Sequence, residues 1–218
     1  PGEALPAPPT GRTCHWIDVD VLDRRAVNGA IAGAPPSAVY HLAGFAHVGR
    51  SWDQALLALQ VNVLGTFHLL SALAAHAPGA RVLIAGSSHV YGDLDRAIAE
   101  SDRLAPASPY GLSKLAQEMV GLRAAADEGQ AVVVSRSFNH IGARQHPSFF
   151  ASGMARQVAL IERGRAERVL AVGNLESRRD LCDARDTVRA YRALAERGRA
   201  GAVYNVCAGQ AYRIGDIL

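Results

Sequence analysis

The sequence predicts an α/β protein organised around a doubly wound parallel sheet. Short runs of branched apolar residues alternate along the chain with longer segments whose apolar residues recur at helical spacing. This alternation is typical of parallel strands joined by right-handed helical crossovers. With 218 residues, of which 49% are hydrophobic and 20% charged, the chain is long and apolar enough to bury a core.

Strands are expected where the apolar runs are short. The runs at residues 38–43, 81–85 and 131–136 are nearly continuous, as in strands that are buried on both faces of a sheet. Weaker runs of similar length predict three further strands, at residues 14–19, 168–172 and 202–206.

Helices are expected between these runs. Asp23 can serve as the N-cap of a helix over residues 23–32, and apolar residues at helical spacing predict a long helix over residues 52–76. Looser patterns predict three more helices, one beginning near Pro109 and two at residues 149–163 and 183–197.

The strand ends indicate where a ligand would bind. In a doubly wound sheet, ligands lie beyond the carboxyl ends of the strands. This rule selects three segments that directly follow expected strands, namely residues 41–44, 87–92 and 138–142. We therefore expect the functional side chains to come from these segments.

Composition narrows the possible classes of function. The formal net charge is only +3 and the basic residues form no run, so nucleic-acid binding is not expected. Cys14, Cys182 and Cys207 match no metal or redox spacing, which predicts no metal site and reduced thiols in a cytoplasmic protein. No stretch approaches the ~20 apolar residues of a membrane span, so no membrane association is expected.

The most informative stretch runs from Ser108 to Lys114. It places Tyr110 and Lys114 four residues apart, on one face of the expected helix. A neighbouring ammonium stabilises a phenolate and lowers the pKa of the tyrosine, which can then exchange a proton with a carbonyl or hydroxyl near neutral pH. A solvated surface pair has the same spacing. The preceding buried run and the serines that end it favour the catalytic interpretation.

Short motifs in a fixed order connect the chain to a known family. They lie at residues 18–23, 41–44, 62–66, 87–92, 110–114, 136–142, 178–180 and 204–206. Together they resemble the extended short-chain dehydrogenase/reductases of the NAD-dependent epimerase/dehydratase family. Within that family the phrases around residues 138–142 and 204–207 are most similar to the branch of GDP-mannose 4,6-dehydratase and GDP-4-keto-6-deoxy-D-mannose reductase. The resemblance implies a Rossmann-like fold that binds NAD or NADP and a nucleotide-diphospho sugar.

The resemblance also implies roles for individual residues. Tyr110 would exchange a proton with the sugar oxygen, Lys114 would hold the nicotinamide ribose, and Ser87 would hydrogen-bond the reacting oxygen. The residues implied to bind the cofactor are Asp20, Val21, Leu42, Ala43, Gly44 and Asn62, together with Tyr110 and Lys114. Those implied to bind the substrate are Ser88, Asn139 and Arg179.

Structural roles explain some of these residues equally well. Ser87 and Ser88 could form a polar turn at a strand end, and Asp20 with Val21 could form a helix-capping turn. Asn62 lies in a mostly apolar helix, where an amide is costly unless it is paired, so a structural duty is at least as good an explanation. His41 is interpreted as a packed residue.

One departure from the family concerns the cofactor site. No loop of the form Gly-x-x-Gly-x-x-Gly, which binds a pyrophosphate through backbone N–H groups, precedes Asp18. We therefore expect a Rossmann-like sheet without its first βαβ unit in residues 1–145. Residues 146–218 are expected to be a mixed region that contributes the substrate-binding part, as part of a small C-terminal domain, and late strands of the sheet.

The second departure concerns the reaction. His89 stands where the sugar 4,6-dehydratases have the glutamate that removes the C5 proton. Imidazole can also act as a base, so His89 is a further catalytic candidate, but its presence favours a reductase over a dehydratase.

The sequence leaves several functions open. The leading hypothesis is an oxidoreductase acting at C4 of a GDP-4-keto-6-deoxyhexose, and the enzymatic alternatives are GDP-mannose 4,6-dehydratase and a nucleotide-sugar 4-epimerase. A non-catalytic sugar-nucleotide-binding homologue is the alternative from another class. The resemblance further implies a homodimer or homotetramer, paired through the helix that carries Asn62 and the helix that follows Tyr110.

Overall fold

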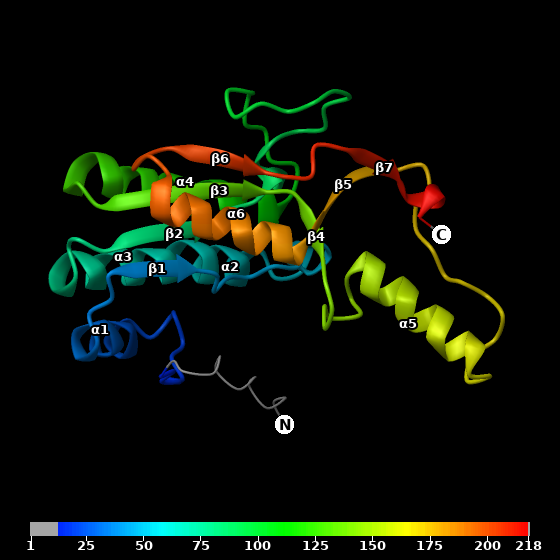
Figure 1. Cartoon of the computed structure of the whole chain (residues 1–218), viewed down its shortest axis with the longest axis horizontal. Helices are drawn as coiled ribbons and strands as arrows, with labels where there is room; N and C mark the ends of the chain where they lie inside the picture. The colour runs from blue at the N-terminus through cyan, green and yellow to red at the C-terminus, as the bar shows by residue number, and fades with distance from the viewer. Residues whose placement is uncertain (1–12, 218) are drawn as a thin grey trace.

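A computed structural model describes residues 13–217, and its main sheet is parallel. The strand order is β1-β2-β3-β6, with β1 at Ala38–His41, β2 at Arg81–Ala85, β3 at Ala131–Ser137 and β6 at Val203–Val206. Figure 1 shows the four strands running in one direction, so their carboxyl ends lie along one edge of the sheet. The predicted parallel α/β sheet is confirmed.

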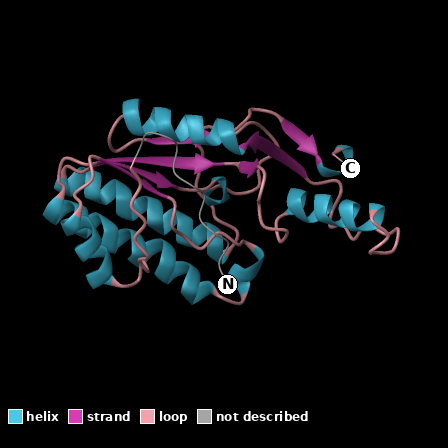
Figure 2. Ribbon diagram, turned by 60° about the horizontal axis from the view of Figure 1, so that its bottom comes forward, coloured by secondary structure: helices cyan, strands magenta, loops and turns pink. Residues whose placement is uncertain are grey.

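Helices cover both faces of this sheet, as Figure 2 shows edge-on. Helices α1 (Arg24–Gly33), α3 (Gly65–His76) and α4 (Pro109–Glu128) lie on one side, and α6 (Ala184–Arg197) lies on the other. Successive residues of β2 face opposite sides, as the pleat requires: Ile84 packs in the cluster with α3, and Leu83 packs in the cluster with α6. Full burial of such a side chain stabilises the fold by about 1.5–3 kcal/mol.

The helix ends follow from local sequence. Asp23 caps α1 by accepting the N–H groups of Arg25 and Ala26, as predicted. Ser108 caps α4, Pro109 occupies its first turn, and Gly129 ends it in the left-handed conformation with φ of 67°. Two further predicted helices are also present, as α5 at Phe150–Glu162 and as α6.

The long helix expected over residues 52–76 is interrupted. A separate 3₁₀ turn occupies Gly49–Trp52, and the helix begins at Ala55 as α2 (Ala55–Leu59). A π-helical turn at Gln60–Leu64 then leads into α3. Single π turns of this kind occur where a helix is locally widened, frequently at functional sites.

The stretch Ala55–His76 corrects the expectation about membranes. By length and composition it could cross one, with a mean hydropathy of 1.6, so the statement that no stretch approaches a span is wrong. The sequence pattern misleads because this helix is apolar on two faces. One face packs on the sheet through Leu70 and Leu73, while the other leaves Leu64 and Phe67 exposed.

A second, smaller sheet and α5 extend beyond the carboxyl edge of the main sheet (Figure 1). Strand β4 (Asn139–Ile141) pairs in parallel with β5 (Arg178–Asp183), which pairs antiparallel with β7 (Ala211–Arg213). Residues 138–142, expected as a loop, therefore contain a short strand. The division into residues 1–145 and 146–218 stays a prediction.

Two expected strands are absent from the part of the chain that the structure describes. Residues 14–19 are irregular, because a strand needs a partner and no described strand pairs with them. Residues 168–172 are also irregular: the side chain of Gln157 binds both backbone groups of Ala171, taking the place of a ladder. Strand β1 is not buried on both faces as expected, since Tyr40 is 43% exposed.

Candidate active site

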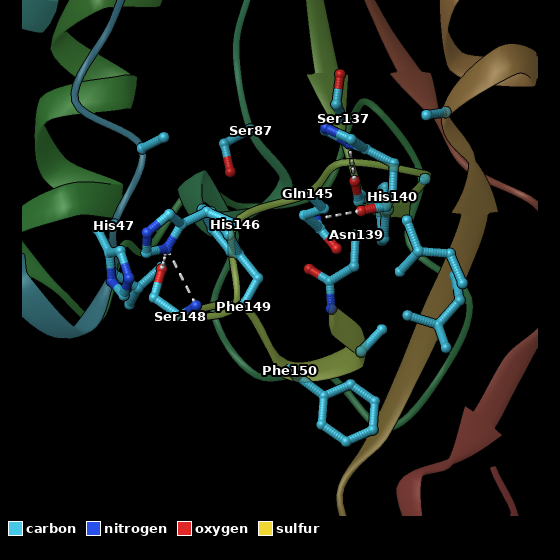
Figure 3. Close-up of a pocket in the computed structure, with 18 of the residues that line it drawn as sticks. His47, Ser87, Ser137, Asn139, His140, Gln145, His146, Ser148, Phe149 and Phe150 are labelled. Carbon is cyan, nitrogen blue, oxygen red and sulfur yellow. Dashed lines mark hydrogen bonds between the residues drawn. The ribbon is translucent and has the colours of Figure 1, made fainter. Parts of the chain in front are cut away.

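Segments that follow β1, β2 and β3 meet in one cavity of about 740 Å³. Its lining comes from residues 46–49, Gly86, Ser87, His89, Tyr110 and most of residues 137–151. Figure 3 shows Ser87 directed into this cavity, with Asn139 on one side and His47 on another. Two of the three segments selected from the sequence thus line it, while the first strand contributes residues 46–49 in place of residues 41–44.

The first turn of α4 holds Tyr110 at this cavity. The Tyr110 N–H donates to Ser51 Oγ at 3.1 Å, and the Gly111 N–H donates to Ser108 Oγ at 3.1 Å. A Cβ on Gly111 would lie 2.4 Å from the carbonyl oxygen of His89, so only glycine lets the helix approach the turn after β2 this closely. These contacts bring the phenol next to the end of β2.

The end of β2 supplies Ser87 and His89. Ser87 is 5% exposed and caps a 3₁₀ turn at Ser88–Val90, its hydroxyl accepting the His89 N–H at 3.2 Å. The ring of His89 meets the ring of Tyr110 edge-on, with 5.6 Å between ring centroids. Partial burial and the charge of Arg179 lower the pKa of His89, and Asp93 opposes them, so its ring favours the neutral form.

The acidity of Tyr110 differs from the sequence-based expectation. Burial raises the pKa of Tyr110, and the hydrogen bond with Ser87 works against that effect. Lys114 is not among the groups that lower this pKa, because its ammonium is turned toward two other acceptors. In this structure the protonated phenol is therefore the favoured form, which suits a proton donor.

Lys114 lies one turn behind Tyr110 and is 7% exposed. Its Nζ donates to the carbonyl oxygen of Ala85 and to Gln117 Oε1, both at 2.9 Å. Burial lowers the pKa of Lys114 to about 8. The described residues thus give this ammonium two acceptors for its three N–H groups.

Asn62 and Gly44 complete the surroundings of Lys114. Asn62, fully buried in the π turn, accepts the Phe45 N–H and donates to the Phe45 carbonyl oxygen and to Ser113 Oγ. This arrangement agrees with the structural duty proposed for its amide. A Cβ on Gly44 would lie 2.9 Å from Asn62 Oδ1 and 3.4 Å from Lys114 Nζ, so glycine lets the backbone pack closely against the Asn62 amide and beside the ammonium.

The residues expected to bind the sugar nucleotide are less well gathered. Asn139 lies on β4 and lines the cavity. Ser88 and Arg179 are not among the lining residues: Ser88 belongs to the 3₁₀ turn, and Arg179 is exposed on β5 with its guanidinium donating to the Arg178 carbonyl oxygen. Arg179 does reach the site electrostatically, through its effect on His89.

The remaining residues expected to bind the cofactor lie away from this cavity. Leu42, Ala43 and Gly44 are exposed after β1. Asp20 accepts the Leu22 N–H and begins the turn into α1, as in the helix-capping alternative. Val21 packs against Gly65 and accepts a hydrogen bond from His68 Nδ1. His41 is buried and bonded to Thr66, which agrees with a packed residue.

A buried polar network beside the cavity was not predicted. Arg136 of β3 forms two hydrogen bonds with Glu118 of α4, at 2.9 and 2.6 Å, and a third with the Tyr91 hydroxyl. Tyr91 in turn donates to Asn205 of β6 at 2.8 Å. The available signal was Arg136 itself, a charged residue inside an apolar strand. Such a residue is almost never buried without a partner.

Metal chemistry has no candidate ligands in the described residues. Within 13–217, no three His, Cys, Asp or Glu side chains lie close enough together to hold an ion. Cys182 is buried and Cys14 and Cys207 are exposed, all three as free thiols.

Comparison with known proteins identifies relatives of this geometry. A family model described as GDP-mannose 4,6 dehydratase matches residues 4–218. The chain is 41% identical over 186 residues to GDP-6-deoxy-D-mannose reductase of Pseudomonas aeruginosa, covering 84% of this chain and 61% of that protein. It thus spans about three fifths of that relative's length.

Solved structures of related proteins are similar to this chain over most of its length. A structure of RMD from Pseudomonas aeruginosa complexed with NADPH matches with a TM-score of 0.88 and 38% identity, over 92% of this chain and 68% of that one. A dTDP-glucose 4,6-dehydratase of Streptomyces venezuelae with NAD bound matches with a TM-score of 0.81 and 27% identity, over 91% and 60%.

Proposed function

Because this chain belongs to the GDP-mannose 4,6 dehydratase family, we propose that it carries the catalytic centre of an NAD(P)-dependent reductase acting on a GDP-4-keto-6-deoxyhexose. The 41% identity to a GDP-6-deoxy-D-mannose reductase supports the substrate class. The observation that carries the proposal is the convergence of Ser87 and Tyr110 on one cavity, with Lys114 one turn behind.

Tyr110 is the proposed proton donor. Reduction of a C4 ketone leaves an oxygen that needs a proton, and the Tyr110 hydroxyl, whose pKa is raised by burial, carries one. Ser87, beside Tyr110 in the same cavity, would hold the ketone oxygen by a hydrogen bond before the proton moves. Asn139 would bind the sugar or diphosphate from β4.

The residues near Lys114 fit a dinucleotide. A bound nicotinamide supplies the hydride for this reaction. Lys114 has an N–H group beyond the two it donates within the protein, and its ammonium lies beside Gly44, which is exposed. We propose that Lys114 holds the ribose there and that residues 42–44, Asp20 and Val21 line the rest of the path. Relatives have been solved with NADPH and with NAD, so both are candidates.

A substrate assay tests the proposal. The purified protein is given GDP-4-keto-6-deoxymannose with NADPH or NADH, and oxidation of the coenzyme is followed together with the sugar product. Reduction of the ketone that is lost in Tyr110→Phe supports the proposal. Binding of the sugar nucleotide without turnover under all conditions would support the non-catalytic homologue instead.

A dehydratase is the second candidate, because His89, although it replaces the expected glutamate, is placed to act as the base. Its ring contacts Tyr110 and its pKa is lowered, so at neutral pH it is unprotonated and able to accept a proton. Incubation with GDP-mannose and NAD distinguishes the two: release of a 4-keto-6-deoxy product that stops in His89→Ala would replace the reductase assignment with this one. The 4-epimerase alternative predicts instead a change of configuration at C4 with no net coenzyme consumption.

We also propose that the protein is a homodimer or homotetramer. The outer faces of α3 and α4 expose Phe67 and Met119, at 52% and 58%, around a groove of about 280 Å³. A contiguous apolar surface of this kind is typical of an interface. Sedimentation of the protein should give an oligomer, and Phe67→Glu should reduce it to a monomer. Flotation of the wild type with lipid vesicles would instead assign this face to a membrane.

Location in the cytoplasm is proposed on the same basis. A second copy on the α3 and α4 faces would cover the exposed part of the apolar stretch Ala55–His76, and three free thiols suit a reducing compartment. Fractionation of the native cells should recover the protein with the soluble material, and recovery with membranes would contradict the proposal.

A further inference from the structure

Lys114 is the only lysine in this sequence, whose other basic residues are all arginines. Its ammonium is one end of a buried hydrogen-bonded chain that continues through Gln117 and Thr66 to Asn62. These last three residues are 0% exposed, so water does not compete for their polar groups. Each link must therefore be made within the protein.

The donor and acceptor of every link can be assigned, because an ammonium only donates. Lys114 Nζ donates to Gln117, which fixes Oε1 as the acceptor at 2.9 Å and turns Nε2 toward Thr66. Gln117 Nε2 then donates to Thr66 Oγ1 at 2.8 Å, and the Thr66 hydroxyl donates its one proton to the Asn62 carbonyl oxygen at 2.7 Å.

The same logic fixes the tautomer of His41. Thr66 Oγ1 has already given its proton, so the 2.8 Å contact with His41 Nε2 requires that this nitrogen donates. Burial and the charge of Lys114 lower the pKa of His41 to about 4, which keeps the ring neutral. The chain thus runs in one direction away from Lys114 and ends on backbone.

We propose that Gln117 is the positioning residue for Lys114, holding the ammonium at the end of β2 and beneath Gly44 through this directed chain. A glutamine side chain anchored at its far end by Thr66 cannot rotate away without leaving buried polar groups unpaired. Lys114 therefore keeps one orientation beside the exposed Gly44, with one N–H left for a ligand. The contact of this N–H with a cofactor rests on the proposed function, whereas the positioning of Lys114 by Gln117 does not.

The single lysine makes the proposal directly measurable. Protein grown with isotope-labelled lysine gives one side-chain signal by NMR, whose titration reports the pKa of Lys114 without cofactor or turnover. His41 from β1 and Tyr110 on α4 are the titratable groups to monitor alongside it. Gln117→Glu sets a carboxylate beside the ammonium and should raise this pKa by about 1 or more. Gln117→Leu removes an acceptor of the charged form and should lower it.

Two further variants complete the design. Gln130→Leu is the matched control, since Gln130 is also a buried glutamine, 5% exposed, but bonds to Leu70 and Glu128 away from Lys114. It should leave the lysine titration unchanged. Thr66→Val removes the oxygen that anchors Gln117, which His41 Nε2 also contacts, but leaves the Gln117 acceptor in place, and should lower the pKa of Lys114 less than Gln117→Leu does. It also provides a decisive reading should Gln117→Leu fail to fold.

Equal lysine titrations in the wild type, Gln117→Glu and Thr66→Val would overturn the inference. Affinity for NADPH, measured by fluorescence, gives a second readout. Gln117→Leu should weaken this affinity about tenfold, because the Lys114 ammonium is no longer held in position to hydrogen-bond the dinucleotide. An unchanged titration in an active reductase would remove this inference alone. Shifted titrations in a protein that binds no dinucleotide would retain Gln117 as a positioning residue and remove the proposed function.

Discussion

Gly111→Ala should separate Tyr110 from the turn that carries Ser87. The added Cβ would lie 2.4 Å from the His89 carbonyl oxygen and 3.1 Å from Pro106 Cβ, whereas ordinary contact begins at 3.4 Å. Relieving the first contact requires a displacement of about 1 Å between α4 and the turn after β2. Because the contacting atom is the backbone oxygen of His89, no side chain can simply rotate away. Overpacking of this kind costs about 1–3 kcal/mol of stability.

The displacement should reduce the rate of catalysis as well as stability. A misplacement of about 1 Å in a catalytic group can cost about 10²-fold in rate, so kcat for ketone reduction should fall by that order while KM changes little. Steady-state kinetics and thermal unfolding are measured on the same preparation. Gly29→Ala is the matched control, because Gly29 is also a helical glycine but has nothing within 4 Å of an added Cβ. Wild-type kcat in a folded Gly111→Ala protein would refute this reasoning.

Three more predictions follow from buried or reacting groups. Tyr110→Phe should lower kcat by about 10²-fold or more with an unchanged melting curve, since only proton transfer is removed. Glu118→Ala leaves the Arg136 guanidinium buried and unpaired and should cost about 3–5 kcal/mol in urea unfolding; the exposed pair Arg192–Glu196 should tolerate Glu196→Ala with little change. His41 has a folded pKa of about 4 against an ordinary 6.5, so the unfolded chain binds the extra proton and stability should fall as pH drops from 6.5 toward 4. That loss, about 3 kcal/mol at most, should disappear in His41→Gln, and an equally steep pH dependence in the variant would contradict it.

The main sheet could be predicted because its signals are local. Its four strands, β1, β2, β3 and β6, each lie in a short apolar run, and the helix ends at Asp23 and Ser108 are set by caps within the first turn. The strand predicted at residues 14–19 is absent for the opposite reason. An extended run becomes a strand only with a partner, and pairing depends on segments far away in the sequence.

The catalytic pair was also accessible from spacing, but its electrostatics were not. A separation of four residues puts Tyr110 and Lys114 on one face of α4 in any helix. Whether Lys114 lowers the pKa of Tyr110 depends on where its ammonium is directed, which is decided by Ala85 and Gln117. Helical periodicity carries no information about that direction.

The geometry of the site also explains why residue 114 is a lysine and not an arginine. Where the chain needs a basic group on the surface it has arginine, so a requirement specific to Lys114 must explain the exception. The site provides two acceptors, and the backbone at Gly44 lies close to the ammonium, since an added Cβ there would be 3.4 Å from Nζ. A guanidinium would bring five N–H donors on a wider, planar head, of which most would be left buried without partners. An ammonium with three donors fits two protein acceptors and keeps one N–H for a ligand, which is why Lys114→Arg should abolish dinucleotide binding although the charge is kept.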